Sequence, residues 1–177
     1  MKKFCKENLA IEIHHHPHHQ SLNENLMNEI SNFGFTPYRE GYGTNIKGSQ
    51  FNFSGKSDSI KPKEVTLIEN WVEQIIKDKL IALTDFDFGT WIARLDKGQE
   101  TVEHDHLYVA THAFVYFVNT PKGSSPLVFP TSGTRIKAEA GKLVVFPASL
   151  RHKVPPNKCD GRITLAANIT ITEKGPA

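Results

Sequence analysis

Cysteine is nearly absent from this chain of 177 residues, which contains only Cys5 and Cys159. Two cysteines without a Cys-x-x-Cys pattern are too few for a disulfide scaffold. The sequence also lacks any apolar run that approaches the length of a membrane span, and its Met1-Lys2-Lys3 start lacks the apolar core of a signal peptide. We therefore expect a protein of a reducing compartment, the cytoplasm, with no membrane partner.

Long runs of one charge are also missing, and the net charge is only +2. Nothing in this balance implies nucleic acid or an anionic membrane as a partner. The hydrophobic fraction of 38% and the charged fraction of 23% are those of an ordinary globular protein. A chain of this length buries a core without cross-links, so we expect one domain over residues 1–177, and a C2 homodimer would be an ordinary assembly for it.

Histidine is abundant by contrast, with nine in the chain and five of them in the segment HHHPHH at His14–His19. Adjacent side chains of an extended segment point to opposite faces, and Pro17 interrupts the run, so these rings are not expected to converge on one ion. Weak surface binding of nickel or zinc is typical of such tracts. We interpret the segment as a solvated polar stretch before the first helix.

Two helices are predicted in the first half of the chain. Ser21 and Glu24 form a capping-box pattern, and Gly34 ends the apolar stripe that follows. The second helix is predicted from about Pro62 to Leu80, with one apolar face. Residues 35–60 are predicted to be a loop, because GYGTN at 41–45 lacks the Lys-Ser/Thr ending of a phosphate-binding loop.

From about Gly89 the pattern changes to short β-type runs separated by turn residues. The runs cover residues 90–95, 111–119, 125–129, 134–138, 142–147, 152–155 and 162–171. So many closely spaced strands predict an antiparallel sandwich or jelly roll. The fold class is therefore mainly β in an α+β layout, with N-terminal helices packed on one sheet. Residues 1–88 would supply helical and loop support, and 89–177 the β core.

The stretch EHDH at 103–106 is the first candidate site. On an extended strand, His104 and His106 face one way, whereas Glu103 and Asp105 face the other. Two imidazoles at this spacing can clamp a divalent metal, and Asp105 can replace His106 only if the strand bulges. His152, which follows the apolar strand 142–147, is the candidate third ligand. The alternative is three unrelated histidines that satisfy local hydrogen bonds.

Arg162 adds a second feature, ten positions after His152, at the start of the run RITLA. It shares a strand face with Thr164 and Ala166. A guanidinium directed into a barrel beside a metal is an unpaired buried charge unless a carboxylate meets it. An external dicarboxylate that chelates the metal with its other end would meet this need. The alternative is an ordinary surface arginine after a turn.

These features occur in a characteristic order over roughly residues 89–170, and the ordered set resembles the 2-oxoglutarate- and Fe(II)-dependent dioxygenase superfamily. More narrowly, it resembles the small bacterial and phage proteins of that superfamily that have a His-x-His motif. The matching segments are Lys97-Gly98, HDH at 104–106, HAFVYFVN at 112–119, GSSPLVF at 123–129, AGKLVVFP at 140–147, HKVP at 152–155 and RIT at 162–164. The superfamily's usual triad has Asp or Glu where this chain has His106.

The resemblance implies a double-stranded β-helix that binds one Fe(II) through His104, His106 and His152. It further implies that 2-oxoglutarate chelates the iron, with its far carboxylate on Arg162. Candidates for a hydrogen bond to that carboxylate are Thr164 and Tyr116. With O2, the expected outcome is decarboxylation to succinate and hydroxylation of an unidentified primary substrate. His112, Trp91, Phe114 and Phe146 are expected in the core.

Two other functions fit the same residues. A cupin-like metalloenzyme, such as a thiol dioxygenase or an isomerase, would use the three histidines without 2-oxoglutarate, and Arg162 would then be dispensable. A non-catalytic jelly-roll module that binds sugar, or an accessory phage structural protein, would contain His-x-His by chance and would retain no metal.

Overall fold

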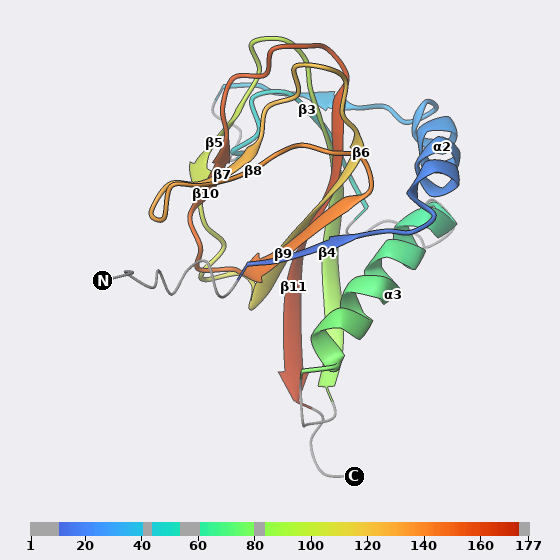
Figure 1. Ribbon diagram of the computed structural model, residues 1–177, viewed down its shortest axis with the longest axis vertical. Helices are drawn as coiled ribbons and strands as arrows, with labels where there is room; N and C mark the ends of the chain where they lie inside the picture. The colour runs from blue at the N-terminus through green and yellow to red at the C-terminus, as the bar shows by residue number, and fades with distance from the viewer. Residues whose placement is uncertain (1–10, 41–43, 54–60, 80–83, 174–177) are drawn as a thin grey trace.

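The computed structural model describes residues 11–40, 44–53, 61–79 and 84–173, and these residues form two antiparallel sheets and two helices (Figure 1). In spatial order, the seven-stranded sheet contains β1 (Glu12–His15), β9 (Lys142–Pro147), β6 (His112–Asn119), β11 (Arg162–Glu173), β4 (Thr84–Leu95), β3 (Ser49–Asn52) and β2 (Thr36–Pro37). The four-stranded sheet contains β5 (Thr101–His104), β10 (His152–Val154), β7 (Leu127–Phe129) and β8 (Thr134–Ile136).

The two sheets share one apolar core, as expected for a jelly roll. Phe129 of the small sheet and Phe146 of the large sheet meet edge to face, with ring centroids 5.0 Å apart. Leu127 and Val154 of the small sheet and Phe117 of the large sheet are buried in the same cluster. The predicted double-stranded β-helix is therefore confirmed.

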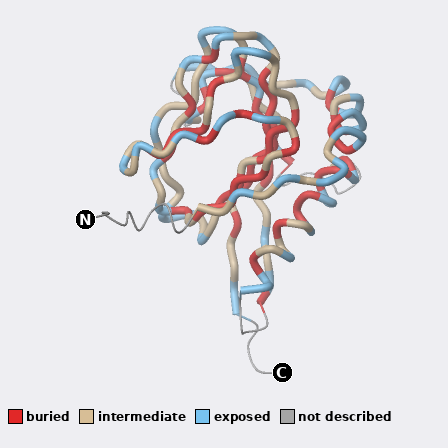
Figure 2. The backbone as a smooth tube through the Cα atoms, viewed as in Figure 1, coloured by how far each residue is buried: buried red, intermediate tan, exposed pale blue. Residues whose placement is uncertain are grey.

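A second core lies on the opposite face of the seven-stranded sheet, where helices α2 (His19–Ile30) and α3 (Lys63–Lys77) pack. Figure 1 shows α3 running beside the long strands β4 and β11, and Figure 2 shows exposed outer faces on both helices. Apolar helix residues such as Leu26 and Ile68 are fully buried in the same cluster as Leu165 of β11. The prediction that the helices pack on one sheet is confirmed. No helix in the described part is long and apolar enough to cross a membrane.

The predicted helix boundaries need correction. Helix α2 begins at His19 rather than after Ser21, and the Ser21 hydroxyl donates to the His18 carbonyl instead of capping a backbone N–H. The capping-box assignment is therefore wrong. Helix α3 begins directly after Pro62, as predicted, and ends at Lys77. The predicted end at Leu80 lies outside the described residues.

The N-terminal half contributes strands as well as helices, which the sequence did not indicate. Strand β1 pairs with β9, and β3 pairs with β4, so residues 35–60 are not simply a loop and the large sheet crosses the predicted boundary at residue 88. The His14–His19 segment continues from β1 into α2, and the His16 ring packs edge to face on Trp71 at 5.0 Å. None of its residues is buried, and His15, Pro17 and His18 are exposed, so the segment is solvated as interpreted, but it is also ordered by β1 and by this ring contact.

Candidate active site

Three histidines converge at one end of the jelly roll. His104, the last residue of β5, pairs directly with His152, the first residue of β10. His106 follows two residues after His104, and its backbone N–H donates to the Ala148 carbonyl at 2.8 Å. One ring nitrogen from each histidine lies within 4.8 Å of the others, close enough to surround a single ion. The structure thus brings His104 and His106, which are two residues apart in the sequence, together with the distant His152.

Hydrogen bonds orient two of these rings. His104 Nδ1 lies 2.8 Å from the Val102 carbonyl and His152 Nδ1 lies 2.9 Å from the Leu150 carbonyl. Each Nδ1–H donates to its carbonyl, so each Nε2 is left unprotonated and free to bind a metal. Burial lowers the pKa of all three imidazoles, to about 4 for His106 and about 3 for His152. The neutral form required of a metal ligand is therefore the stable one near pH 7.

The acidic residues of the same stretch are directed elsewhere. Glu103 accepts from Arg151 Nε at 2.9 Å, and an Asp105 carboxylate oxygen lies 3.6 Å from the same guanidinium. Asp105 also accepts from the Leu107 backbone N–H, which holds it in a local turn. The geometry therefore favours His106 over Asp105 as the second candidate ligand.

The three histidines line a cavity of about 560 Å³. Its opposite wall is the inner face of the seven-stranded sheet, including Trp91 of β4 and every second residue of β11 from Arg162 to Asn168. Trp91 was expected in the core, but its ring lies beside His106 with centroids 6.3 Å apart. The register that places Trp91 on this wall, opposite Ala166 of β11, is visible only in the structure.

Arg162 is buried in this cavity, with 1% of its surface exposed. Its Nε donates to the Ser125 carbonyl at 3.1 Å, and its guanidinium lies 5.3 Å from the Phe117 ring. No carboxylate of the described residues lies within ion-pair distance, and Nη2 has no hydrogen-bond partner among them. Burial lowers the pKa of Arg162 to about 10, so the side chain remains charged near pH 7. An unpaired buried cation at a cavity wall is suited to an anionic ligand.

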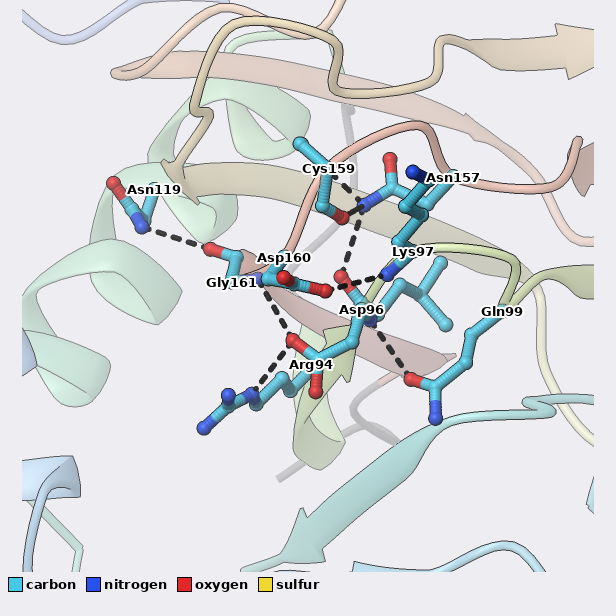
Figure 3. A network of polar contacts seen from close by, with 10 residues as sticks. Arg94, Asp96, Lys97, Gln99, Asn119, Asn157, Cys159, Asp160 and Gly161 are labelled. Carbon is cyan, nitrogen blue, oxygen red and sulfur yellow. Dashed lines mark hydrogen bonds and ion pairs between the residues drawn. The ribbon is translucent and has the colours of Figure 1, made fainter.

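A polar network holds the strand end that carries Arg162 (Figure 3). An Asp96 carboxylate oxygen accepts from the Gly161 backbone N–H at 2.8 Å, and Asp160 accepts from the Lys97 N–H at 3.0 Å. Gly161 adopts a φ of +74°, a conformation that L side chains rarely take. The Asn157 amide donates to the Leu95 carbonyl and accepts from the Ser125 N–H. The network thus fixes both Arg162 and the segment at Ser125 to which it donates.

Of the two predicted hydrogen-bonding partners beside Arg162, the structure brings only one into the cavity. Thr164 is buried and lines the wall two residues from Arg162. Tyr116 lies in the core beneath the helices, where its hydroxyl donates to Asn23 of α2 at 2.7 Å. The assignment of Tyr116 to the cosubstrate is therefore wrong. His112 is half-buried and does not line the cavity, and Asn168, which does, was not singled out from the sequence.

Comparison with known proteins identifies the fold. No family model matches the sequence, and the curated proteins contain no significant match. Among solved structures, a viral collagen prolyl hydroxylase from Paramecium bursaria Chlorella virus-1, crystallised with 2OG, is 18% identical with a TM-score of 0.72, over 90% of this chain and 95% of that one. The chain has the fold of a 2-oxoglutarate oxygenase.

Two further structures give the same result. A Pseudomonas putida prolyl-4-hydroxylase is 19% identical with a TM-score of 0.66, and the match covers 94% of each chain. An oxidoreductase of the 2OG-Fe(II) oxygenase family from Burkholderia pseudomallei is 12% identical with a TM-score of 0.69, over 92% of this chain and 84% of that one. At such identities the likeness is one of fold, and the chemistry has to be argued from the side chains.

Proposed function

We propose that this protein is an Fe(II)- and 2-oxoglutarate-dependent oxygenase of the hydroxylase type. The main observation in support of the proposal is that one cavity contains both a possible metal site and an unpaired cation. Three imidazoles approach closely enough to share an ion, and a buried guanidinium on the same cavity has no anionic partner among the described residues. A small dicarboxylate that binds the metal at one end and Arg162 at the other would complete both.

The donor set fits Fe(II). Imidazole nitrogen is a common ligand of iron, and three protein ligands leave coordination positions open for a cosubstrate and O2. Three neutral imidazoles leave the full +2 charge of the ion at the site, so a chelating carboxylate is favoured there electrostatically. His104 and His152 are also oriented by backbone carbonyls, as metal-bound histidines usually are.

When bound, the iron and 2-oxoglutarate supply the oxidising chemistry, in which O2 is consumed, 2-oxoglutarate becomes succinate and CO2, and a C–H bond of the substrate becomes C–OH. The residues of this chain supply position and environment. Arg162 would hold the far carboxylate through its unpaired Nη2, and Thr164 would donate a hydroxyl hydrogen bond to it. The apolar side chains of Trp91, Val115 and Ala166 line the wall nearby and would exclude water.

The fold relatives support this proposal. The viral prolyl hydroxylase was crystallised with 2OG, and the Burkholderia protein carries the name of the 2OG-Fe(II) oxygenase family. We extend the proposal to a single domain acting in the cytoplasm on a primary substrate that is not yet identified. The assembly state, for which a homodimer is the prediction, is measurable by light scattering in solution.

The test is anaerobic titration of the protein with Fe(II) and then 2-oxoglutarate, followed by succinate measurement in air. We expect a visible charge-transfer band when both are present and succinate formation that depends on both. Arg162→Ala should retain metal but lose the band and the succinate. The matched control is Arg135→Ala on β8, an exposed arginine outside the cavity, which should behave like the wild type.

Two outcomes would contradict the proposal and point to the alternatives. Turnover that survives Arg162→Ala would indicate a metalloenzyme that does not use 2-oxoglutarate. If the wild type and His104→Ala alike retain none of Fe, Mn or Ni, the protein is a binding module in which the histidine cluster has no metal function.

A further inference from the structure

Asn168 of β11 is a second unsatisfied polar group of the cavity. It lines the cavity wall, and its Oδ1 is buried without a hydrogen-bond partner among the described residues. The carboxamide oxygen is a hydrogen-bond acceptor. A buried acceptor in this condition costs free energy unless a ligand supplies the donor. Nothing in the proposed binding of iron and 2-oxoglutarate involves it.

The position of Asn168 separates it from 2-oxoglutarate. It lies on the same face of β11 as Arg162 but six residues further along, a distance of about 20 Å at roughly 3.4 Å per residue. His106 lies between them, because its ring is next to Trp91, which pairs with Ala166. A diacid that spans from Arg162 to the histidines therefore ends before it reaches Asn168. The part of the cavity beyond the metal is left for the primary substrate.

The polar groups of this cavity are almost all uncharged. Apart from the three histidines, Arg162 is the only described lining residue with an ionisable side chain. The other strongly polar groups include four carboxamides, from Asn45, Gln50, Asn52 and Asn168. Beyond Arg162, the described lining residues offer a charged substrate group no permanently charged partner, whereas carboxamides match groups that both donate and accept hydrogen bonds. The cavity is therefore suited to an uncharged, hydrogen-bonding part of a substrate.

We propose that Asn168 is a specificity-determining residue that accepts a hydrogen bond from an amide N–H on an uncharged part of the primary substrate. The inference rests on the proposed oxygenase function and adds the chemical class of substrate. The amide would lie beyond the histidines, and the carbon to be oxidised would lie against Trp91 and Ala166. Asn168 then sets which carbon faces the metal.

The first test needs no substrate. Asn168→Leu removes the unpaired acceptor at nearly constant volume, so the melting temperature of the metal-free protein should stay the same or rise. The control is Asn157→Leu, because Asn157 is a buried asparagine that is fully hydrogen-bonded to Leu95, Cys159 and Ser125. That control should melt well below the wild type. A comparable loss in Asn168→Leu would overturn the proposal, because Asn168 would then support the fold.

The second test uses N-acetyl amino-acid amides as probes, with uncharged, lysine and glutamate side chains. Succinate formation above the amide-free rate is the measurement. Uncharged probes should stimulate the wild type, and Asn168→Leu should raise KM for the best probe about tenfold, the value of one neutral hydrogen bond. KM for 2-oxoglutarate should not change. Methylation of the recognised amide nitrogen of the probe should raise its KM by the same factor in the wild type and should not change KM in the variant.

Three results would overturn the inference alone: equal KM values in the variant, a preference for charged probes, or no stimulation by any uncharged amide while the wild type still binds 2-oxoglutarate. Failure of the wild type to bind 2-oxoglutarate at all would instead overturn the proposed function, and this inference with it.

Discussion

Replacing Arg162 by methionine is expected to stabilise the ligand-free protein and to weaken 2-oxoglutarate binding severely. Methionine keeps an unbranched stem but removes the charge, and Arg162 is among the largest fully buried side chains of the molecule. The two effects have opposite signs. Without ligand, the buried guanidinium destabilises the folded protein, whereas with ligand it pairs with the carboxylate and stabilises the complex. A purely structural arginine would show the opposite sign in the first measurement.

The size of the stability effect follows from the surroundings of the charge. Burial lowers the pKa of Arg162 from its ordinary 12.5 to about 10. At about 1.4 kcal/mol per pKa unit, this corresponds to about 3 kcal/mol against the charged form. The substitution also removes the bond to the Ser125 carbonyl and the contact with the Phe117 ring, together about 1–2 kcal/mol. A net gain of about 1–2 kcal/mol should raise Tm by about 2–8 °C.

The binding effect is larger. Removing one member of a buried charge pair costs about 2–5 kcal/mol, which weakens 2-oxoglutarate binding by about 30- to 4,000-fold. Thermal melting of the metal-free protein and calorimetric titration of the Mn(II)-loaded protein measure the two quantities, with Arg135→Met as the control for an exposed arginine. A ligand-free variant that melts several degrees below the wild type, or one that binds 2-oxoglutarate unchanged, would refute the reasoning.

Three further predictions concern the surroundings of the site. His106→Ala should weaken Mn(II) binding on the order of 100-fold, because losing a ligand costs at least as much as losing a residue that orients one. Asp105→Ala should leave Mn(II) affinity unchanged. Titration with paramagnetic Mn(II) measures the affinity of both variants. Tyr116→Phe should lower the free energy of unfolding by about 1–2 kcal/mol in urea, because Asn23 loses its donor, without changing KM for 2-oxoglutarate. Asp96→Ala should raise that KM about tenfold in the succinate assay, because the turn before β11 loses its acceptor and Arg162 is misplaced.

The sequence predicted the histidines and Arg162 of the site better than the other residues that line its cavity. Alternation predicted that His104 and His106 lie together, and they do, although β5 ends at His104 and His106 lies two residues beyond it. The same rule groups Arg162 with Thr164 on β11. Alternation does not say which face of a strand meets which neighbour. Strand β6 is buried on both faces, by helices on one side and by the second sheet on the other, so Tyr116 could not be assigned from periodicity.

The N-terminal strands were missed for a different reason. Strand β1, with the sequence EIHH, lacks the alternation of apolar and polar residues that identifies a half-buried strand, and it pairs with β9, which is more than 120 residues away in the chain. Its position depends on long-range pairing and on the contact of His16 with Trp71, neither of which leaves a local signal. The displaced start of α2 has the same origin, because only three residues separate this strand from the helix.

Strand β11 shows why the site is tied to the register of the sheet. One face carries Arg162, Thr164 and Asn168 into the cavity, and the other buries Leu165 and Ile169 beneath the helices. Pairing with β4 along its whole length and with β6 over most of the inner half fixes this register on both sides. A slip by one residue would place the arginine in the apolar core and leucine in the cavity. The same apolar packing that stabilises the helices therefore also holds the guanidinium and the carboxamide on the cavity face of β11.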